Sequence, residues 1–177
     1  MEKACIHLYI GNGRGKTCSA IGLAIRAAGH RKKAVIFHFL KSGTSGEDLF
    51  IRAYAPEYLK VCTCEREHGF YPFLEEEEQL LVKNEQHTTL KRVKASIISG
   101  VFIIVLDEII DSINNGIISY NDFFEIIELA KKYNTELVLT GRDPIDKIVE
   151  LSDYVTEFNS IKHPFEKLQK ARDGIEY

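Results

Sequence analysis

The feature that most restricts the fold is a glycine-rich loop between an apolar run and a helical run near the N-terminus. Residues 4–10 are mostly apolar, residues 11–17 end in Lys-Thr, and residues 16–28 are rich in Ala, Ile and Leu. This order predicts a strand, a tight loop and a helix. Such a loop directs backbone N–H groups at phosphate oxygens, while its lysine adds a point charge and its hydroxyl reaches a divalent metal. The predicted phosphate-binding residues are Gly11, Asn12, Gly13, Arg14, Gly15, Lys16 and Thr17.

The loop departs from the strict G-x-x-x-x-G-K-[ST] pattern, because Ile10 stands where that pattern has glycine. It is the shorter variant G-x-x-x-G-K-T. The alternative is a glycine-rich turn that binds no ligand. Three glycines followed by Lys-Thr at a strand-to-helix junction favour the phosphate loop.

Strand-like runs alternate with helix-like stretches along the whole chain. The expected strands are residues 4–10, 34–40, 59–63, 101–107, 136–140 and 154–158, and the expected helices are residues 16–28, 75–99, 120–133 and 144–151. This alternation predicts an α/β fold with a mainly parallel sheet of about six strands, covered on both faces as in the three-layer sandwich of P-loop NTPases. We expect Gly29 to terminate the first helix. A length of 177 residues is typical of a single domain over residues 1–177.

Charge and composition limit the classes of partner. The chain has 23 Lys or Arg and 26 Asp or Glu, for a net charge of −3, which excludes a general nucleic-acid or membrane-surface binder. The longest apolar run, residues 101–106, is too short to cross a bilayer. No secretory leader is evident, so we expect a cytoplasmic protein. The four cysteines are then most simply reduced thiols: Cys5, Cys18, Cys62 and Cys64.

Two further strand ends carry chemistry. Asp107 and Glu108 follow the apolar run of residues 101–106, and Arg142 follows the run of residues 136–140. The carboxyl ends of parallel strands meet at one edge of the sheet, so these side chains are expected beside the phosphate loop. Taken alone, the acids are also compatible with a turn and the arginine with a surface ion pair. Together with the loop, they predict a Mg²⁺ (or Mn²⁺) nucleotide site: the metal ligands are Thr17, Asp107 and Glu108, and the catalytic candidates are Lys16, Thr17, Glu108 and Arg142.

The sequence resembles the ATP:corrinoid adenosyltransferase family of the P-loop type. Its characteristic motifs occur in order over essentially the whole chain: residues 11–17, His38-Phe39-Leu40-Lys41, Leu106-Asp107-Glu108, residues 137–142, residues 153–157, Lys162-His163-Pro164-Phe165 and residues 171–177. The two C-terminal motifs are much more specific than the phosphate loop.

The resemblance implies transfer of the 5′-deoxyadenosyl group of ATP to the Co(I) form of a corrinoid, such as cobalamin or cobyrinic acid a,c-diamide, with release of triphosphate. It implies that ATP binds in the reverse of the usual P-loop orientation, with Asn12 near the ribose and Arg142 at a terminal phosphate. His163 becomes a candidate site residue through its motif alone. The resemblance also implies a homodimer and an electron donor such as a flavodoxin-like reductase.

The corrinoid contact is expected in the loop of residues 69–73, Gly-Phe-Tyr-Pro-Phe. Family members commonly have Gly-Phe-x-Trp here, whereas this chain has no tryptophan. Phe70 is the nearest counterpart, and Phe73 or Tyr71 is the candidate for the second ring. Two other functions stay open from the residues alone: a nucleoside or small-molecule kinase using a base such as Glu108, and a non-catalytic nucleotide- or corrinoid-binding module.

Overall fold

The computed structural model describes residues 3–41, 45–55, 57–64, 69–164 and 169–175. Its elements are β1 (Ile6–Ile10), α1 (Lys16–Gly29), β2 (Ala34–His38), α2 (Gly46–Tyr54), β3 (Leu59–Cys62), a 3-10 turn (Tyr71–Phe73), α3 (Glu76–Ile98), β4 (Ile103–Asp107), α4 (Ile109–Asn114), α5 (Tyr120–Tyr133), β5 (Glu136–Thr140), α6 (Asp146–Leu151) and β6 (Tyr154–Glu157).

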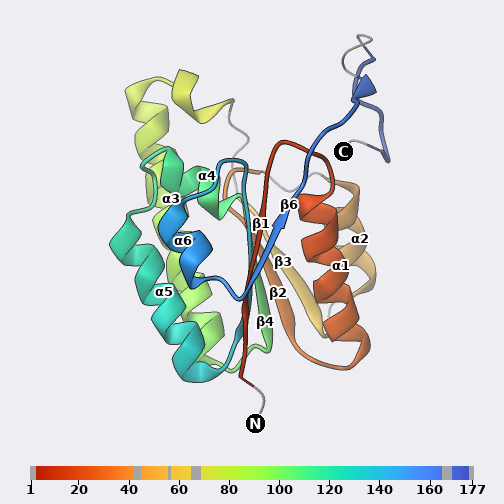
Figure 1. Cartoon of the computed structure of the whole chain (residues 1–177), viewed down its shortest axis with the longest axis vertical. Helices are drawn as coiled ribbons and strands as arrows, with labels where there is room; N and C mark the ends of the chain where they lie inside the picture. The colour runs from red at the N-terminus through yellow and green to blue at the C-terminus, as the bar shows by residue number, and fades with distance from the viewer. Residues whose placement is uncertain (1–2, 42–44, 56, 65–68, 165–168, 176–177) are drawn as a thin grey trace.

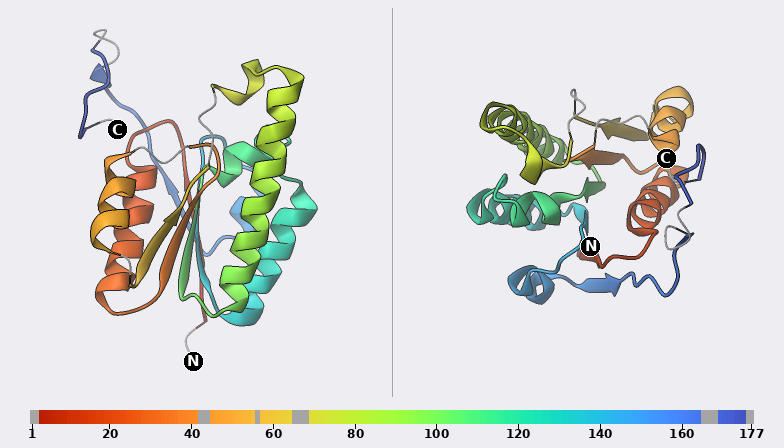
Figure 2. Two further views of the ribbon diagram at one scale, coloured as in Figure 1. Left: turned by 180° about the vertical axis from the view of Figure 1, so that it is seen from behind. Right: turned by 90° about the horizontal axis from the view of Figure 1, so that it is seen from above.

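The six strands form one parallel sheet in the order β3-β2-β4-β5-β1-β6. Figure 1 and Figure 2 show α1 and α2 against one face and α3, α4, α5 and α6 against the other. Strands β2 and β4 are buried along their whole length, which accounts for their continuous apolar sequences. The predicted α/β sandwich with a parallel sheet is confirmed.

Two helices were missing from the sequence prediction, and one helix end was misplaced. Helix α2 lies between the expected strands of residues 34–40 and 59–63, where no helix was predicted, and α4 follows β4 so closely that its apolar residues extend the strand-like run. Gly29 does not terminate α1, because the helix includes Gly29 and the left-handed residue is Arg31, with φ 58°. The N–H of Arg31 donates to the Ala28 carbonyl at 2.8 Å and that of Lys32 to the Ala27 carbonyl at 3.0 Å, which is a Schellman ending.

The order of strands determines what surrounds the phosphate loop. Strand β5 lies between β1 and β4, so the residues after β5 lie between the loop and the acidic end of β4. On the other side of β1, the chain leaving β6 runs against the loop: a Cβ on Gly11 would collide with the carbonyl oxygen of Phe158, and one on Gly13 would lie 2.7 Å from it. These two glycines are therefore required by the packing of Phe158 as well as by any ligand.

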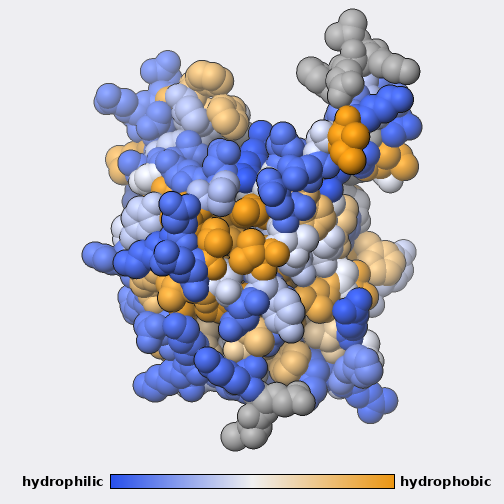
Figure 3. All heavy atoms as spheres, in the orientation of Figure 1, coloured by the Kyte–Doolittle hydropathy of each residue, from blue (hydrophilic) through white to orange (hydrophobic). Residues whose placement is uncertain are grey.

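The outermost strand of the sheet on the β1 side, β6, presents a partly apolar surface. Strand β6 is exposed along its length, with Tyr154 at 55% and Val155 at 45% of their full exposure. Figure 3 shows apolar side chains gathered on this face, over α6 and β6, with hydrophilic residues around them. Among the helices of the described residues, none combines the length and the apolar character needed to cross a bilayer.

Candidate active site

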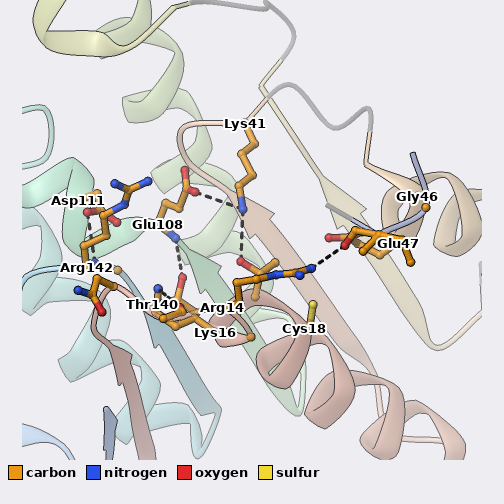
Figure 4. Close-up of a pocket in the computed structure, with 17 residues that line it drawn as sticks. Arg14, Lys16, Cys18, Lys41, Gly46, Glu47, Glu108, Asp111, Thr140 and Arg142 are labelled. Carbon is orange, nitrogen blue, oxygen red and sulfur yellow. Dashed lines mark hydrogen bonds and ion pairs between the residues drawn. The ribbon is translucent and has the colours of Figure 1, made fainter. Parts of the chain in front are cut away.

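A cavity of about 660 Å³ opens at the carboxyl edge of the sheet, between the phosphate loop and the ends of β4 and β5. Figure 4 shows its side chains converging from these elements. Its lining includes Asn12, Gly13, Arg14, Gly15, Lys16, Thr17, Lys41, Glu108, Asp111, Thr140 and Arg142. The predicted phosphate loop, acidic strand end and arginine therefore do meet at one edge.

Lys16 points back across its own loop. Its Nζ donates to the carbonyl oxygens of Gly11 at 2.6 Å and Gly13 at 2.9 Å. Burial and the neighbouring positive charge of Arg142 lower the pKa of Lys16, although Asp111 and other acids oppose them. An anionic ligand in this cavity would favour the charged ammonium and give it stronger acceptors than two carbonyls.

Only part of the loop backbone is directed at a ligand. The Gly11 N–H donates to the Arg142 carbonyl at 2.8 Å, and the Gly13 N–H donates to the Phe158 carbonyl at 2.7 Å. Helix α1 begins at Lys16, and the N–H groups of a first helical turn have no partner inside the helix. The start of α1 is thus the stronger anion-binding feature, because its N–H groups and the helix dipole point the same way.

Asp107 is the centre of the polar network at the end of β4. It is fully buried, and its Oδ1 accepts hydrogen bonds from the hydroxyls of Thr17 at 2.9 Å and Thr140 at 2.7 Å. Burial alone would raise its pKa, but the hydrogen bond from His38 and the charge of Lys41 outweigh burial and hold the pKa well below its usual range. Asp107 is therefore ionised at neutral pH.

His38 is a buried member of this network to which the sequence interpretation gave no role. Its Nδ1 lies 2.8 Å from Asp107 Oδ2, and its Nε2 lies 3.0 Å from Asp48 Oδ1. Burial opposes the charge on the ring, yet the two carboxylates raise the pKa of His38 to about 9, so both ring nitrogens carry protons and donate. The role of His38 could have been predicted only from the register of β2 with β4, which pairs His38 with Asp107.

Glu108 leaves the strand in an unusual conformation. Its φ is 63°, a left-handed value that a non-glycine residue adopts at some cost, and its N–H donates to the Thr140 hydroxyl at 2.9 Å. This turn directs the carboxylate into the cavity, where Oε1 lies 3.2 Å from Lys41 Nζ (Figure 4).

Three predicted residues bound the cavity on its outer sides. The Arg142 N–H donates to Asp111 Oδ1 at 3.3 Å, while the Arg142 side chain is exposed. The Arg14 guanidinium donates to the carbonyl of Ile175 at 2.8 Å, and Gly174 and Ile175 complete this side of the cavity. Asn12 Oδ1 accepts from the Ser160 N–H at 3.3 Å.

A second cavity of about 570 Å³ adjoins the first. Lys41, Glu108, Asp111 and Arg142 line both cavities, and Phe70 lines the second one only. Phe70 is 64% exposed, so its ring is accessible to a ligand in the second cavity.

The other two corrinoid candidates differ in their relation to the second cavity, which Tyr71 lines and Phe73 does not. Phe73 is 85% exposed and is absent from the lining of both cavities, although its ring lies 5.6 Å from that of Phe70. Tyr71 packs in the core with 7% of its surface exposed, and it also lines the second cavity beside Phe70. His163 is half-buried and lines neither cavity. Phe165 and residues 176–177 of the C-terminal motifs lie outside the described residues.

The parallel sheet, the phosphate loop and the acidic strand end define a P-loop nucleotide-binding protein. The family model "ATP:corrinoid adenosyltransferase BtuR/CobO/CobP" matches residues 2–177. The chain belongs to this ATP:corrinoid adenosyltransferase family.

Three relatives illustrate the similarity. The corrinoid adenosyltransferase of Escherichia coli K12 is 31% identical over 99% of this chain and 87% of its own. That of Pseudomonas aeruginosa is 30% identical over 99% of this chain and 85% of its own. The corrinoid adenosyltransferase CobA of Salmonella typhimurium is 29% identical over 99% and 87% respectively.

Proposed function

We propose that the chain transfers the 5′-deoxyadenosyl group of ATP to the Co(I) form of a corrinoid and releases triphosphate. The single observation that carries this proposal is the pair of adjoining cavities, one against the phosphate loop and one against an exposed aromatic ring. Membership of the family supports it. Two substrates can then occupy neighbouring cavities with their reacting atoms at the shared wall.

The side chains of the first cavity suit a leaving group that carries several negative charges. Lys16, the first turn of α1 and Arg142 supply positive charge from three directions. Carbon–oxygen cleavage at C5′ develops charge on the triphosphate, so groups that stabilise this charge lower the barrier. The barrier is lowered further if C5′ is held in line with the cobalt of a corrinoid in the next cavity.

The oxygens near Lys41 fit a divalent metal. Thr17 Oγ1, Asp107 Oδ2 and Glu108 Oε1 already surround one cation, the Lys41 ammonium, at 3.1 to 3.3 Å. Hydroxyl and carboxylate oxygens are the donors that Mg²⁺ prefers, so these residues would hold it. When bound, the metal would neutralise charge on the triphosphate.

The reaction needs no general base, because Co(I) carries no proton to remove. A kinase, the enzymatic alternative, needs a base placed beside an acceptor hydroxyl. Glu108 Oε1 lies 3.2 Å from Lys41 Nζ, and buried Asp107 accepts hydrogen bonds from four donors that include Lys41 and His38. The two acids at the end of β4 are therefore both engaged with cations. This geometry favours metal and phosphate binding over proton abstraction.

The experiment that tests the proposal is incubation with ATP, Mg²⁺, a corrinoid and a chemical reductant, followed by visible absorption of the corrinoid. We expect conversion to the adenosylated form, which depends on both ATP and the protein. Consumption of ATP without any change of the corrinoid spectrum would contradict the proposal and favour the kinase or a binding module.

Replacing Phe70 by alanine is expected to slow adenosylation about tenfold or more, with little change in ATP affinity. The reason is that Phe70 lines only the second cavity, and truncating an aromatic ring that packs against a ligand costs ~1.4 kcal/mol or more, which is a factor of ten. The measurement is the rate of adenosylation of a Co(II) corrinoid reduced on the enzyme, beside ATP binding by calorimetry. Phe73→Ala, which removes a neighbouring ring that lines neither cavity, is the matched control and is expected to keep the wild-type rate. A Phe70→Ala variant that adenosylates at the wild-type rate would assign Phe70 to local packing.

Further properties belong to the same proposal. The chain acts as a single domain over residues 1–177 and as a homodimer in the cytoplasm, and a flavodoxin-like reductase supplies the Co(I) form. The single sheet in the described residues supports one domain, and the exposed, partly apolar β6 supports self-association.

A further inference from the structure

The Lys41 ammonium occupies a position that the proposed function leaves unexplained. Its Nζ lies 3.1 Å from Asp107 Oδ2, 3.2 Å from Glu108 Oε1 and 3.3 Å from the Thr17 hydroxyl oxygen. These are the same three residues that fit the metal. The Thr17 hydroxyl donates its proton to Asp107 Oδ1, so its lone pairs are turned toward the ammonium.

This position is specific to Lys41 among the neighbouring cations. Lys16 is bound to two loop carbonyls, and Arg142 is exposed to solvent in both cavities. The Lys41 side chain is 39% exposed, and its Nζ contacts two carboxylates at once, those of Asp107 and Glu108. It is a firmly held charge and not a loose surface pair.

A divalent metal and this ammonium exclude each other. A metal bound to Asp107 and Glu108 would sit about 2.1 Å from its oxygens, within the space that the ammonium fills. Two cations a few ångströms apart in a partly buried site repel by several kcal/mol at an effective dielectric constant of ~20. Entry of the metal therefore requires departure of the lysine.

We propose that the Lys41 ammonium is a built-in competitor of the divalent metal: it holds the metal's oxygens while no nucleotide is bound and leaves them when the metal enters with ATP. The triphosphate supplies new anionic oxygens in the cavity that Lys41 lines, so the displaced ammonium stays paired. When a metal binds without nucleotide, the displaced Lys41 ammonium has no triphosphate to pair with. The site thus takes up metal together with ATP, and not before it.

The displaced lysine also connects the two cavities. Lys41 lines the nucleotide cavity and the cavity of Phe70, so its movement changes the charge at their shared wall.

The test is titration of the nucleotide-free full chain with Mn²⁺, with free Mn²⁺ followed by electron paramagnetic resonance. We expect weak binding by the wild type and at least about tenfold tighter binding by Lys41→Met, which corresponds to ~1.4 kcal/mol. Lys41→Arg keeps the charge and is expected to bind as weakly as the wild type. Lys60→Met, which changes an exposed lysine on β3, is the matched control and is expected to change nothing.

Added ATP gives a second readout, because it offers the wild-type lysine a new partner. The difference in Mn²⁺ affinity between Lys41→Met and the wild type is expected to be smaller when ATP is present. If Lys41→Met binds Mn²⁺ no more tightly than the wild type, or if Lys41→Arg binds as tightly as Lys41→Met, the proposal is wrong. Circular dichroism establishes that each variant is folded, and Lys41→Gln replaces Lys41→Met if the latter is not.

This inference rests on the proposed nucleotide and metal site, but not on corrinoid chemistry. The first titration contains neither ATP nor corrinoid, so an enzyme that fails to adenosylate a corrinoid can still show the competition. Conversely, an active enzyme whose Lys41→Met variant gains no affinity for Mn²⁺ would overturn only the role of Lys41.

Discussion

Replacing Lys16 by alanine is expected to slow ATP use by roughly 30- to 1000-fold, a loss of about 2 to 4 kcal/mol, while the fold stays intact. Lys16 lies in the loop that lines the nucleotide cavity, and its present partners are two backbone carbonyls that it can exchange for phosphate oxygens. Charge-assisted hydrogen bonds to a triphosphate are stronger than those it gives up. The measurement is kcat/KM for ATP in corrinoid adenosylation.

The control for Lys16 is Lys91→Ala, which changes an exposed lysine in the middle of α3. It is expected to leave kcat/KM unchanged. A folded Lys16→Ala variant with wild-type ATP kinetics would remove the loop from the site.

Replacing Asp107 by asparagine is expected to lower the free energy of unfolding by about 3 to 5 kcal/mol, because it leaves buried cations without their carboxylate. Asp107 is paired with His38 and Lys41, and His38 is itself only 1% exposed. The measurement is urea denaturation at pH 7. Asp146→Asn, which changes an exposed acid at the start of α6, is expected to change the value by less than about 0.5 kcal/mol.

The pairing of His38 with Asp107 predicts how the free energy of unfolding depends on pH. The pKa of His38 is raised from 6.5 to about 9 in the folded protein. The stabilisation of the folded state by protonated His38 is therefore fully present below pH 6.5 and is lost as pH rises through 9. In Asp107→Asn this loss is expected to occur at lower pH. Equal stability of Asp107→Asn and the wild type at every pH would contradict the description of this network.

The parts of the fold that follow local rules could be predicted from the sequence. The central strands β2 and β4 are continuous apolar runs, and the loop between β1 and α1 has the composition of a phosphate loop. Because carboxyl ends of parallel strands share an edge, Asp107, Glu108 and Arg142 could also be assigned to the edge of the sheet that carries the phosphate loop.

The network around Asp107 could not be predicted, because it depends on contacts between distant residues. His38 and Asp107 are 69 positions apart and meet only through the register of β2 with β4. Asp48 reaches His38 from α2, a helix that the sequence did not indicate. The glycine pattern of the loop indicates phosphate binding, but it does not indicate that Gly11 and Gly13 are also required by the close approach of Phe158.

The measurement that tests the central claim most directly is phosphorus NMR of the reaction mixture. Attack at C5′ breaks a carbon–oxygen bond and leaves the three phosphates linked, whereas a kinase or an ATPase breaks a bond to the γ-phosphorus. We predict release of intact triphosphate, in step with formation of the cobalt–carbon bond and dependent on the corrinoid. ADP accompanied by phosphate, or by a phosphorylated acceptor, would contradict adenosyl transfer even if the nucleotide site is correct.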